Sequence, residues 1–347
     1  MNAAELIAAI LWLALAAYAV LAGADFGGGV WDILARGPRA GDQRRAVAEA
    51  LGPVWEANHV WLIFLITGLF TAFPSAFGAL ATALYLPFTI ALIGIILRGS
   101  AFAFRAHARE AVGPLSTWGV IFGAASIVTP VLLATTAAAV GGGFVVIRGT
   151  QLESGYFAGW TTPFAMVLGL FALALCAYLA ATYLMVETED RPELMGDFRR
   201  RAAAAGLVSG GLGLLALLTA WLEAPRLFES LTGRGLPLFL LALLNGPLAL
   251  WAVLKSRPRI ARAAVVAQMV LVLAAWVVGQ WPFLVPPGVT IEAAAAPAAT
   301  LTAMVVVIAA GMALLIPSLW LLFRVFKARN PAVDSGNPST SGQPTSE

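Results

Sequence analysis

"GPVWEANHVWLIF", residues 52–64, opens a long apolar run with a carboxylate, a carboxamide and an imidazole. These three polar groups belong to Glu56, Asn58 and His59, and they lie between Trp55 and Trp61. Residues three apart on a helix share a face, so Glu56 and His59 are expected to point the same way. The purpose of a titratable pair at the head of an apolar helix depends on which aqueous phase that helix end faces.

The composition around this stretch is that of a membrane protein. The chain has 347 residues, of which 60% are hydrophobic and 11% charged, whereas soluble domains carry about 25% charged residues. The one cysteine, Cys176, lies in an apolar run and cannot form an intrachain disulfide. The first apolar run has no preceding Lys or Arg, so we interpret it as a retained transmembrane helix rather than a cleaved signal peptide. No nucleic-acid partner is expected.

Nine apolar segments are long enough to cross the bilayer, whose hydrocarbon core is about 30 Å thick. They are too long for strands and lack alternation, and lipid-exposed backbone must satisfy its own hydrogen bonds. We therefore predict an all-α integral membrane protein with nine transmembrane helices. The segments are 4–24, 55–73, 76–97, 117–140, 157–186, 202–222, 236–254, 263–281 and 299–326.

Basic residues predict the orientation of these spans. Eighteen of the 21 Lys and Arg fall in alternate connections and the C-terminal flank, and the other connections hold only Arg148, Arg226 and Arg234. Because Lys and Arg accumulate on the cytoplasmic side, the N-terminus is predicted outside and the C-terminus in the cytoplasm. Residues 1–327 then form the transmembrane domain. Residues 328–347, rich in Pro, Ser, Gly and Thr, form a tail that is predicted to be disordered.

This orientation gathers ionisable side chains at the cytoplasmic face. Asp25 is expected to end the first helix, Glu56 and His59 to begin the second, and Arg98 to end the third. An acid beside a histidine at the mouth of a helix bundle is what proton uptake from the cytoplasm requires. The alternative is interfacial anchoring, with the carboxylates as helix caps and the arginine snorkelling to the membrane edge. Trp55, Asn58 and Trp61 would support the site.

Other polar features carry weaker signals. Asn245-Gly246-Pro247 falls within the seventh span, where proline is expected to kink the helix. Gln268 and Gln280 could form hydrogen bonds across helices. The sequence contains no nucleotide-binding loop, no HExxH, no CxxC and no Gly-x-Ser-x-Gly motif, and no metal site is predicted. With one intramembrane histidine, the chain is not expected to bind a haem alone, so any redox centre should belong to another subunit.

Several stretches, in order, resemble subunit II of the cytochrome bd-type quinol oxidases. The likeness is carried by "GADFGGGVWD" (23–32), "GPVWEANHVWLI" (52–63), "TPFAMVLGL" with "AATYLMVET" (162–188), "NGPLALWA" (245–252) and "WPFLVPP" (281–287). The resemblance implies two four-helix bundles plus one peripheral helix in a bacterial cell (inner) membrane. It also implies a homologous subunit I that carries haem b and haem d and the main quinol site.

The implied activity is quinol oxidation coupled to reduction of dioxygen to water in aerobic respiration, with this chain alone inactive. By the resemblance, the acid at the position of Glu56 is associated with a proton route, and Asp25 and Arg98 belong to the same cytoplasmic cluster. A quinone bound in subunit II and a small accessory subunit are further possibilities, in addition to membrane lipid.

The sequence also departs from the family pattern. The family commonly has an acid where this chain has Ala22, Asp-Gly where it has Glu56-Ala57, and often glutamine where it has His59. The family's detailed proton route therefore does not carry over to this chain unchanged.

Two alternatives remain open from the residues. One is a secondary transporter, which would need paired broken helices and a polar midplane. The other is a purely structural subunit with no part in proton transfer.

Overall fold

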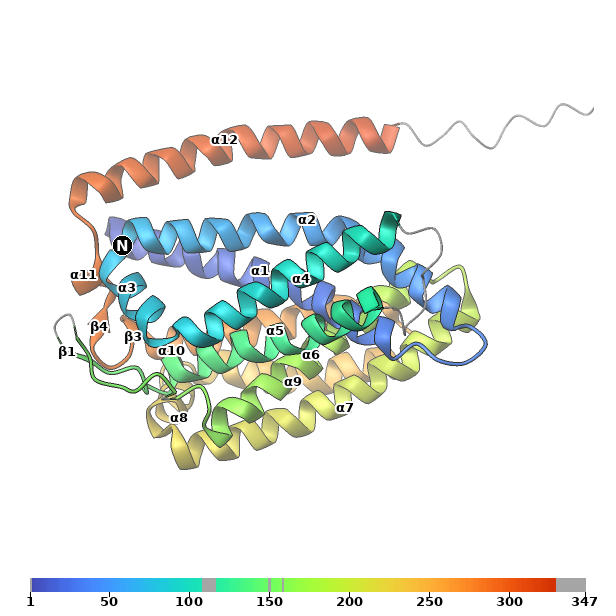
Figure 1. Ribbon diagram of the computed structural model, residues 1–347, viewed down its shortest axis with the longest axis horizontal. Helices are drawn as coiled ribbons and strands as arrows, with labels where there is room; N and C mark the ends of the chain where they lie inside the picture. The colour runs from blue at the N-terminus through green and yellow to red at the C-terminus, as the bar shows by residue number, and fades with distance from the viewer. Residues whose placement is uncertain (1, 108–116, 149–150, 158, 329–347) are drawn as a thin grey trace, which may run out of the picture. The chain divides into compact units, whose positions relative to one another are not determined.

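The computed structural model describes residues 2–107, 117–148, 151–157 and 159–328 (Figure 1). Within these ranges the side chains of residues 51–56, 105–107, 147–148, 151–152, 315–316, 319–320 and 322–328 are not described. The helices are α1 (Ala3–Ile33), α2 (Ala40–Ala72), α3 (Pro74–Ala83), α4 (Tyr85–His107), α5 (Thr117–Gly141), α6 (Pro163–Glu187), α7 (Pro192–Glu223), α8 (Pro225–Thr232), α9 (Leu236–Leu254), α10 (Pro258–Gln280), α11 (Ile291–Ala294) and α12 (Ala298–Ala328).

Short strands occur only in connections of the described chain. β1 (Ile147–Arg148) pairs with β2 (Gln151–Leu152), and β3 (Phe283–Val285) pairs with β4 (Val289–Thr290), both antiparallel. The second hairpin occupies the Pro-rich exit from α10. We did not expect strands, but these hairpins join helices and leave the all-α class unchanged.

The helix starts follow local sequence signals. Asn2 caps α1: its side chain accepts a hydrogen bond from the Glu5 amide at 2.8 Å, and Glu5 accepts one from the Asn2 amide at 3.0 Å. Thr162 caps α6 in the same way through the amide of Ala165. Several other helices begin with proline, whose fixed φ suits the first turn and whose missing N–H costs nothing there.

Membrane-spanning length is found in seven described helices, α1, α4 (over Tyr85–Phe104), α5, α6, α7, α9 and α10. An eighth candidate is the bent pair of Ala57–Ala72 and Pro74–Ala83, which meet at 117°. The predicted single span 76–97 is wrong, because the chain breaks between α3 and α4. Pro87 explains the position of the break: it has no N–H to bond the Ala83 carbonyl, so a continuous helix would lose a hydrogen bond there.

The helices up to Ala296 form one compact unit around α1. α1 packs against α2, α5, α6 and α10; α4 packs on α5; α6 packs on α7 and α10; and α9 packs on α7 and α10. The largest cluster of buried residues joins side chains from these helices, including Trp31, Val47, Met185, Phe198 and Val265. In Figure 1, α2 and α4 lie on one side of this unit and α7 and α9 on the other.

Close approach of α1 to its neighbours depends on glycine. A Cβ on Gly27 would come within 2.0 Å of the Cys176 carbonyl oxygen of α6. A Cβ on Gly29 would come within 2.0 Å of the Ser126 hydroxyl of α5. Real atoms do not approach so closely, so these two glycines set the distance between α1 and its neighbours.

Three Arg-rich connections meet at one end of the unit. Arg39, before α2, donates to Asp197 of α7 at 2.9 and 2.8 Å, and this carboxylate raises the pKa of the Arg39 guanidinium. Arg199 donates to Ser256 after α9 at 2.9 Å. These contacts bring the start of α2, the first turns of α7 and the residues after α9 to the same side of the helix bundle.

The second unit contains α12, which is described here by itself. It is apolar from Ala298 to Leu314 and has Pro317 in its interior. Residue 328 is still helical, and the rest of the predicted tail, 329–347, lies outside the described residues.

Candidate functional site

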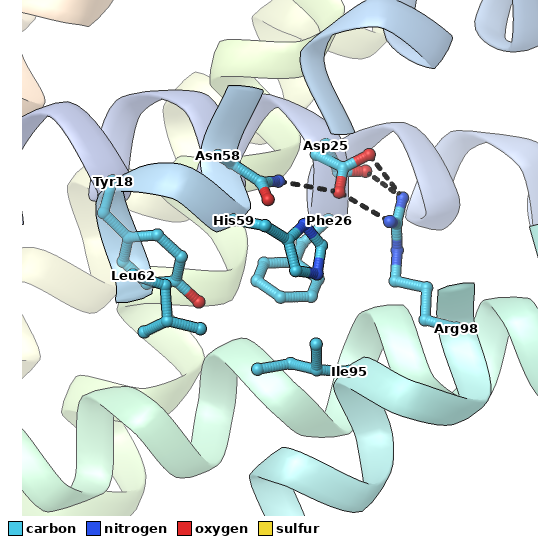
Figure 2. A pocket seen from close by; sticks show the side chains of 8 residues that line it. All are labelled: Tyr18, Asp25, Phe26, Asn58, His59, Leu62, Ile95 and Arg98. Atoms are coloured by element: carbon cyan, nitrogen blue, oxygen red, sulfur yellow. Dashed lines mark hydrogen bonds and ion pairs between the residues drawn. The ribbon is translucent and has the colours of Figure 1, made fainter. Parts of the chain in front are cut away.

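A buried ion pair joins α1 to α4. Arg98 donates from Nη1 to Asp25 Oδ2 at 2.5 Å and from Nη2 to Oδ1 at 2.7 Å (Figure 2). Nη2 also donates to the Asp25 backbone carbonyl at 2.8 Å. Both side chains are 4% exposed. Such bidentate, charge-assisted pairs are among the stronger hydrogen bonds in proteins, and here the pair ties two membrane helices together.

The remaining surface of the Arg98 guanidinium is also occupied. Its Nε donates to the Ser126 hydroxyl of α5 at 2.9 Å, and Ser126 in turn donates to the Phe122 carbonyl at 2.7 Å. The rings of Phe122 and Phe26 lie 4.6 and 5.4 Å from the guanidinium carbon. Cation–π contacts of this kind gain strength when they are desolvated. Arg98 is therefore a fixed positive charge with little freedom to reorient.

α2 contributes a carboxamide and an imidazole to the same site. Asn58 is buried and donates to Asp25 Oδ2 at 3.1 Å. Asp25 thus accepts from Arg98 and Asn58, which is the pattern of an ionised, acceptor-only carboxylate. His59 is partly exposed and lines the adjoining pocket.

The pocket is small and mixed in character. Its walls are Tyr18, Asp25, Phe26, Asn58, His59, Leu62, Ile95 and Arg98 (Figure 2). The cavity volume of about 10 Å³ gives room for roughly one water molecule. A water there would have an imidazole, a carboxylate and a phenol within the same set of walls. The arrangement can hold a proton donor or acceptor inside a membrane bundle, and it cannot enclose a large ligand.

The prediction that Asp25, Glu56, His59 and Arg98 lie at helix ends is wrong. Asp25 lies about two turns before the end of α1, and Arg98 about two turns before the end of α4. α2 begins at Ala40, so Glu56 and His59 lie in its middle and not in its first turns. The expected meeting of Asp25, His59 and Arg98 is confirmed, but inside the bundle, where the simple capping and snorkelling alternatives do not apply to Asp25 and Arg98.

The other predicted site residues have different outcomes. The side chains of Trp55 and Glu56 lie outside the described residues. Trp61 packs against the buried cluster of Tyr18, Ala22 and Phe26. Sequence reasoning missed Ser126 and Phe122. Ser126 could have been predicted, because it is a polar residue on an apolar helix. Nothing in the sequence distinguishes Phe122 from the other phenylalanines.

The pocket beside His59 does not fit a haem. Among the described side chains, no group of three or more His, Cys, Asp or Glu could hold a metal ion. His59 faces a space of about 10 Å³, far smaller than a macrocycle. We therefore assign no step in this site to a haem.

Comparison with known proteins agrees with the whole-chain resemblance. The family described as "Cytochrome bd terminal oxidase subunit II" matches residues 3–326. A Bacillus subtilis protein whose name describes a cytochrome bd menaquinol oxidase subunit II is 23% identical over 91% of this chain and 93% of its own length. The Escherichia coli cytochrome bd-I ubiquinol oxidase subunit 2 is 29% identical over 62% of this chain and 57% of its own.

A solved structure shares the fold. The structure of bd oxidase from Geobacillus thermodenitrificans contains a chain with a TM-score of 0.78 and 23% identity, covering 95% of this chain and 100% of that one. With a family match over nearly the entire chain and seven candidate spans, the chain belongs to the family of cytochrome bd terminal oxidase subunit II, and it is a multi-pass bacterial inner-membrane component of a quinol oxidase complex.

Proposed function

We propose that this chain is the haem-free subunit II of an oxidase that oxidises a quinol and reduces dioxygen to water. The observation that carries the mechanistic part is the buried Asp25–Arg98 pair with Asn58 and His59 beside it. Charged groups inside a membrane bundle are costly and tend to mark ion or proton routes. One relative is named for ubiquinol and another for menaquinol, and we assign the quinol only as a class.

Nine helices cross the membrane in this proposal. Seven are the helices of spanning length, the eighth is α2 from Ala57 with its bend into α3, and the ninth is α12. Packing supports one four-helix bundle of α1, α2, α4 and α5 and another of α6, α7, α9 and α10. α12 would be the peripheral helix.

The N-terminus lies outside and the C-terminus in the cytoplasm. Support comes from the end of the unit where Arg39 contacts Asp197 and Arg199 contacts Ser256, because three Arg-rich connections meet there. Basic connections favour the cytoplasmic side. In that orientation α1 ends, and α2 begins, in the cytoplasm.

The partner is subunit I, which would carry haem b and haem d. The surface that suits it is the exposed apolar face of α2 and α4, with Val60, Ile63 and Phe70 on one helix and Leu92 and Ile96 on the other. Exposed apolar patches mark protein or lipid contacts. This surface adjoins Leu62 and Ile95 of the polar pocket, so a subunit docked here would cover the pocket.

The proton route runs through α2 toward the ion pair. Glu56 would collect protons, His59 would pass them on, and Asp25, held by Arg98 and Asn58, would stabilise the positive charge as it passes. Asp32 extends this route. It is buried on α1, seven residues and so about 10 Å beyond Asp25 toward the Arg-rich end. α1 therefore carries two carboxylates, Asp25 and Asp32, although it lacks the acid that the family commonly has at the position of Ala22.

The identity is tested on the complex purified through a tag on this chain. We expect haem absorption bands and quinol-driven oxygen consumption from the complex, and no haem bands when the chain is produced alone. A tagged complex without haem, or uptake of a solute by the chain alone, would contradict the assignment and favour a transporter.

Glu56→Gln tests the proton route. Because a proton-collecting carboxylate matters most when protons are scarce, we expect oxygen reduction to fall about tenfold at about pH 8.5 and less than about twofold at about pH 6. The measurement is the pH profile of oxygen consumption by the purified complex, with its haem spectrum as a check on assembly. Glu49→Gln is the matched control, since Glu49 is an exposed acid on the same helix. A Glu56→Gln profile that overlays the wild-type profile would leave only the purely structural role.

A further inference from the structure

Two carboxamides meet in the middle of neighbouring membrane helices on the side away from α2 and α4. Asn245 of α9 donates from Nδ2 to Gln268 Oε1 of α10 at 2.9 Å, and also to the Ala264 carbonyl at 2.8 Å. Asn245 lies near the centre of Leu236–Leu254, and Gln268 near the centre of Pro258–Gln280. The predicted cross-helix bond of Gln268 is confirmed. Gln280 differs: it is buried, and neither Nε2 nor Oε1 has a hydrogen-bond partner in the described chain.

The mid-span bonds leave one acceptor and one donor unused. Both bonds use Asn245 Nδ2, so Asn245 Oδ1 and Gln268 Nε2 make no hydrogen bond among the described residues. The two side chains are only partly buried, and their neighbours on α9 face outward: Leu241, Leu244 and Leu248 are 52%, 71% and 49% exposed. In hydrocarbon, polar groups without partners cost free energy that another helix can recover.

Gly246 makes this face accessible to a neighbour. A Cβ at this position would meet only Gln268 Oε1, at 4.0 Å. Packing within the chain therefore does not require a glycine here, and small residues on membrane helices permit close approach by a second helix. Pro247, which follows, is exposed on the same helix.

We infer that a second copy of this chain docks on the α9–α10 face. In a two-fold symmetric pair, if Asn245 of one copy contacts Gln268 of the other, then Gln268 of the first copy also contacts Asn245 of the second. Asn245 Oδ1 of each copy then accepts from Gln268 Nε2 of the other, and both unused groups of both copies are satisfied. Lipid chains offer no such partners, and an accessory helix would need its own donor and acceptor at the same depth. Self-complementarity favours the second copy.

This face is compatible with the proposed position of subunit I. α9 packs on α7, α8 and α10, whereas the surface proposed for subunit I belongs to α2 and α4 on the other side of the unit (Figure 1). The paired assembly would therefore contain two oxidase complexes joined through their subunits II. The inference does not depend on the proton route.

The test uses two differently tagged copies of this chain, coexpressed with the rest of the complex and captured through one tag. We expect the second tag to be co-captured, and Asn245→Leu or Gln268→Leu in both copies to lower the co-captured fraction about fivefold to tenfold. Haem content and oxygen consumption should not change. Thr219→Leu on α7 is the control for replacing a polar membrane residue, because Thr219 bonds only to carbonyls of its own helix.

Complementation makes the test specific. An Asn245→Leu copy keeps Gln268, and a Gln268→Leu copy keeps Asn245, so the mixed pair retains one of the two intermolecular bonds. Co-capture should therefore be higher for the mixed pair than for either variant with itself. Leu244→Cys should also form a disulfide-linked dimer in membranes, whereas Leu222→Cys on α7, similarly exposed, should not. Equal co-capture in all pairs, absence of co-capture in wild type, or a different small chain captured in place of the second copy would overturn the inference.

Discussion

Arg98→Leu is expected to prevent assembly of the oxidase. The substitution leaves the Asp25 carboxylate buried at 4% exposure without its cation, and breaking a buried pair from one side costs about 3–5 kcal/mol. It also removes the donor to Ser126 and the cation between the rings of Phe26 and Phe122. The measurement is the yield of haem-containing complex captured through a tag on this chain, compared with wild type at equal expression.

A double variant separates charge from packing. Asp25→Asn combined with Arg98→Leu removes both charges, and replacing a buried pair as a whole is often nearly neutral for stability. We expect the double variant to recover most of the assembly lost in Arg98→Leu but to reduce oxygen slowly, because the charged centre is gone. Arg259→Leu serves as the surface control: its partner Glu189 lies 3.2 Å away at an exposed position, where such pairs contribute about 0–1 kcal/mol. Normal yield from Arg98→Leu would show that the pair does not hold α1 to α4.

Hydropathy predicted the membrane class and most of the helices, but it misplaced their ends. An apolar window records where side chains prefer lipid, whereas a helix continues as long as its backbone hydrogen bonds and packing allow. α1 therefore runs through "GADFGGGVWD" to Ile33, although Asp25 and three glycines resemble a helix end. α2 begins at Ala40, before its apolar part, because its polar first half packs through Ala46 and Val47.

The sequence predicted which residues form the candidate site better than it predicted where in the helices they lie. The side chains of Asp25, Asn58, His59 and Arg98 carry chemistry that is rare in apolar segments, so the sequence marked them. Their burial depends on which helices touch, and that information is spread over unremarkable residues such as Gly29, Phe122 and Ser126. The placement at helix ends was consequently wrong, while the grouping of Asp25, His59 and Arg98 was correct.

The same packing explains why glycines of α1 control the site. Gly27 and Gly29 lie two and four residues after Asp25, and they face Cys176 of α6 and Ser126 of α5. Any increase in the distance between α1 and α5 would also move Asp25 relative to Ser126, which holds Arg98 Nε. Helix spacing and the geometry of the polar pocket are therefore linked through a few small residues.

Gly27→Ala is expected to destabilise the complex strongly, although it adds a single methyl group. That methyl would lie 2.0 Å from the Cys176 carbonyl oxygen and 2.8 Å from the Ala180 Cβ, and backbone atoms can relieve the overlap only if α1 and α6 separate. Overpacking of this kind costs about 1–3 kcal/mol and more where backbone must move, so the thermal midpoint of the purified complex should fall. Gly211→Ala is the matched control, because nothing lies within 4 Å of a Cβ there; in a helix interior this change should stabilise by about 0.5–1 kcal/mol. Midpoints must be compared at one scan rate, since unfolding of membrane complexes is commonly irreversible. If Gly27→Ala matched Gly211→Ala in midpoint and activity, α1 and α6 would not be in the close contact on which the site's geometry depends.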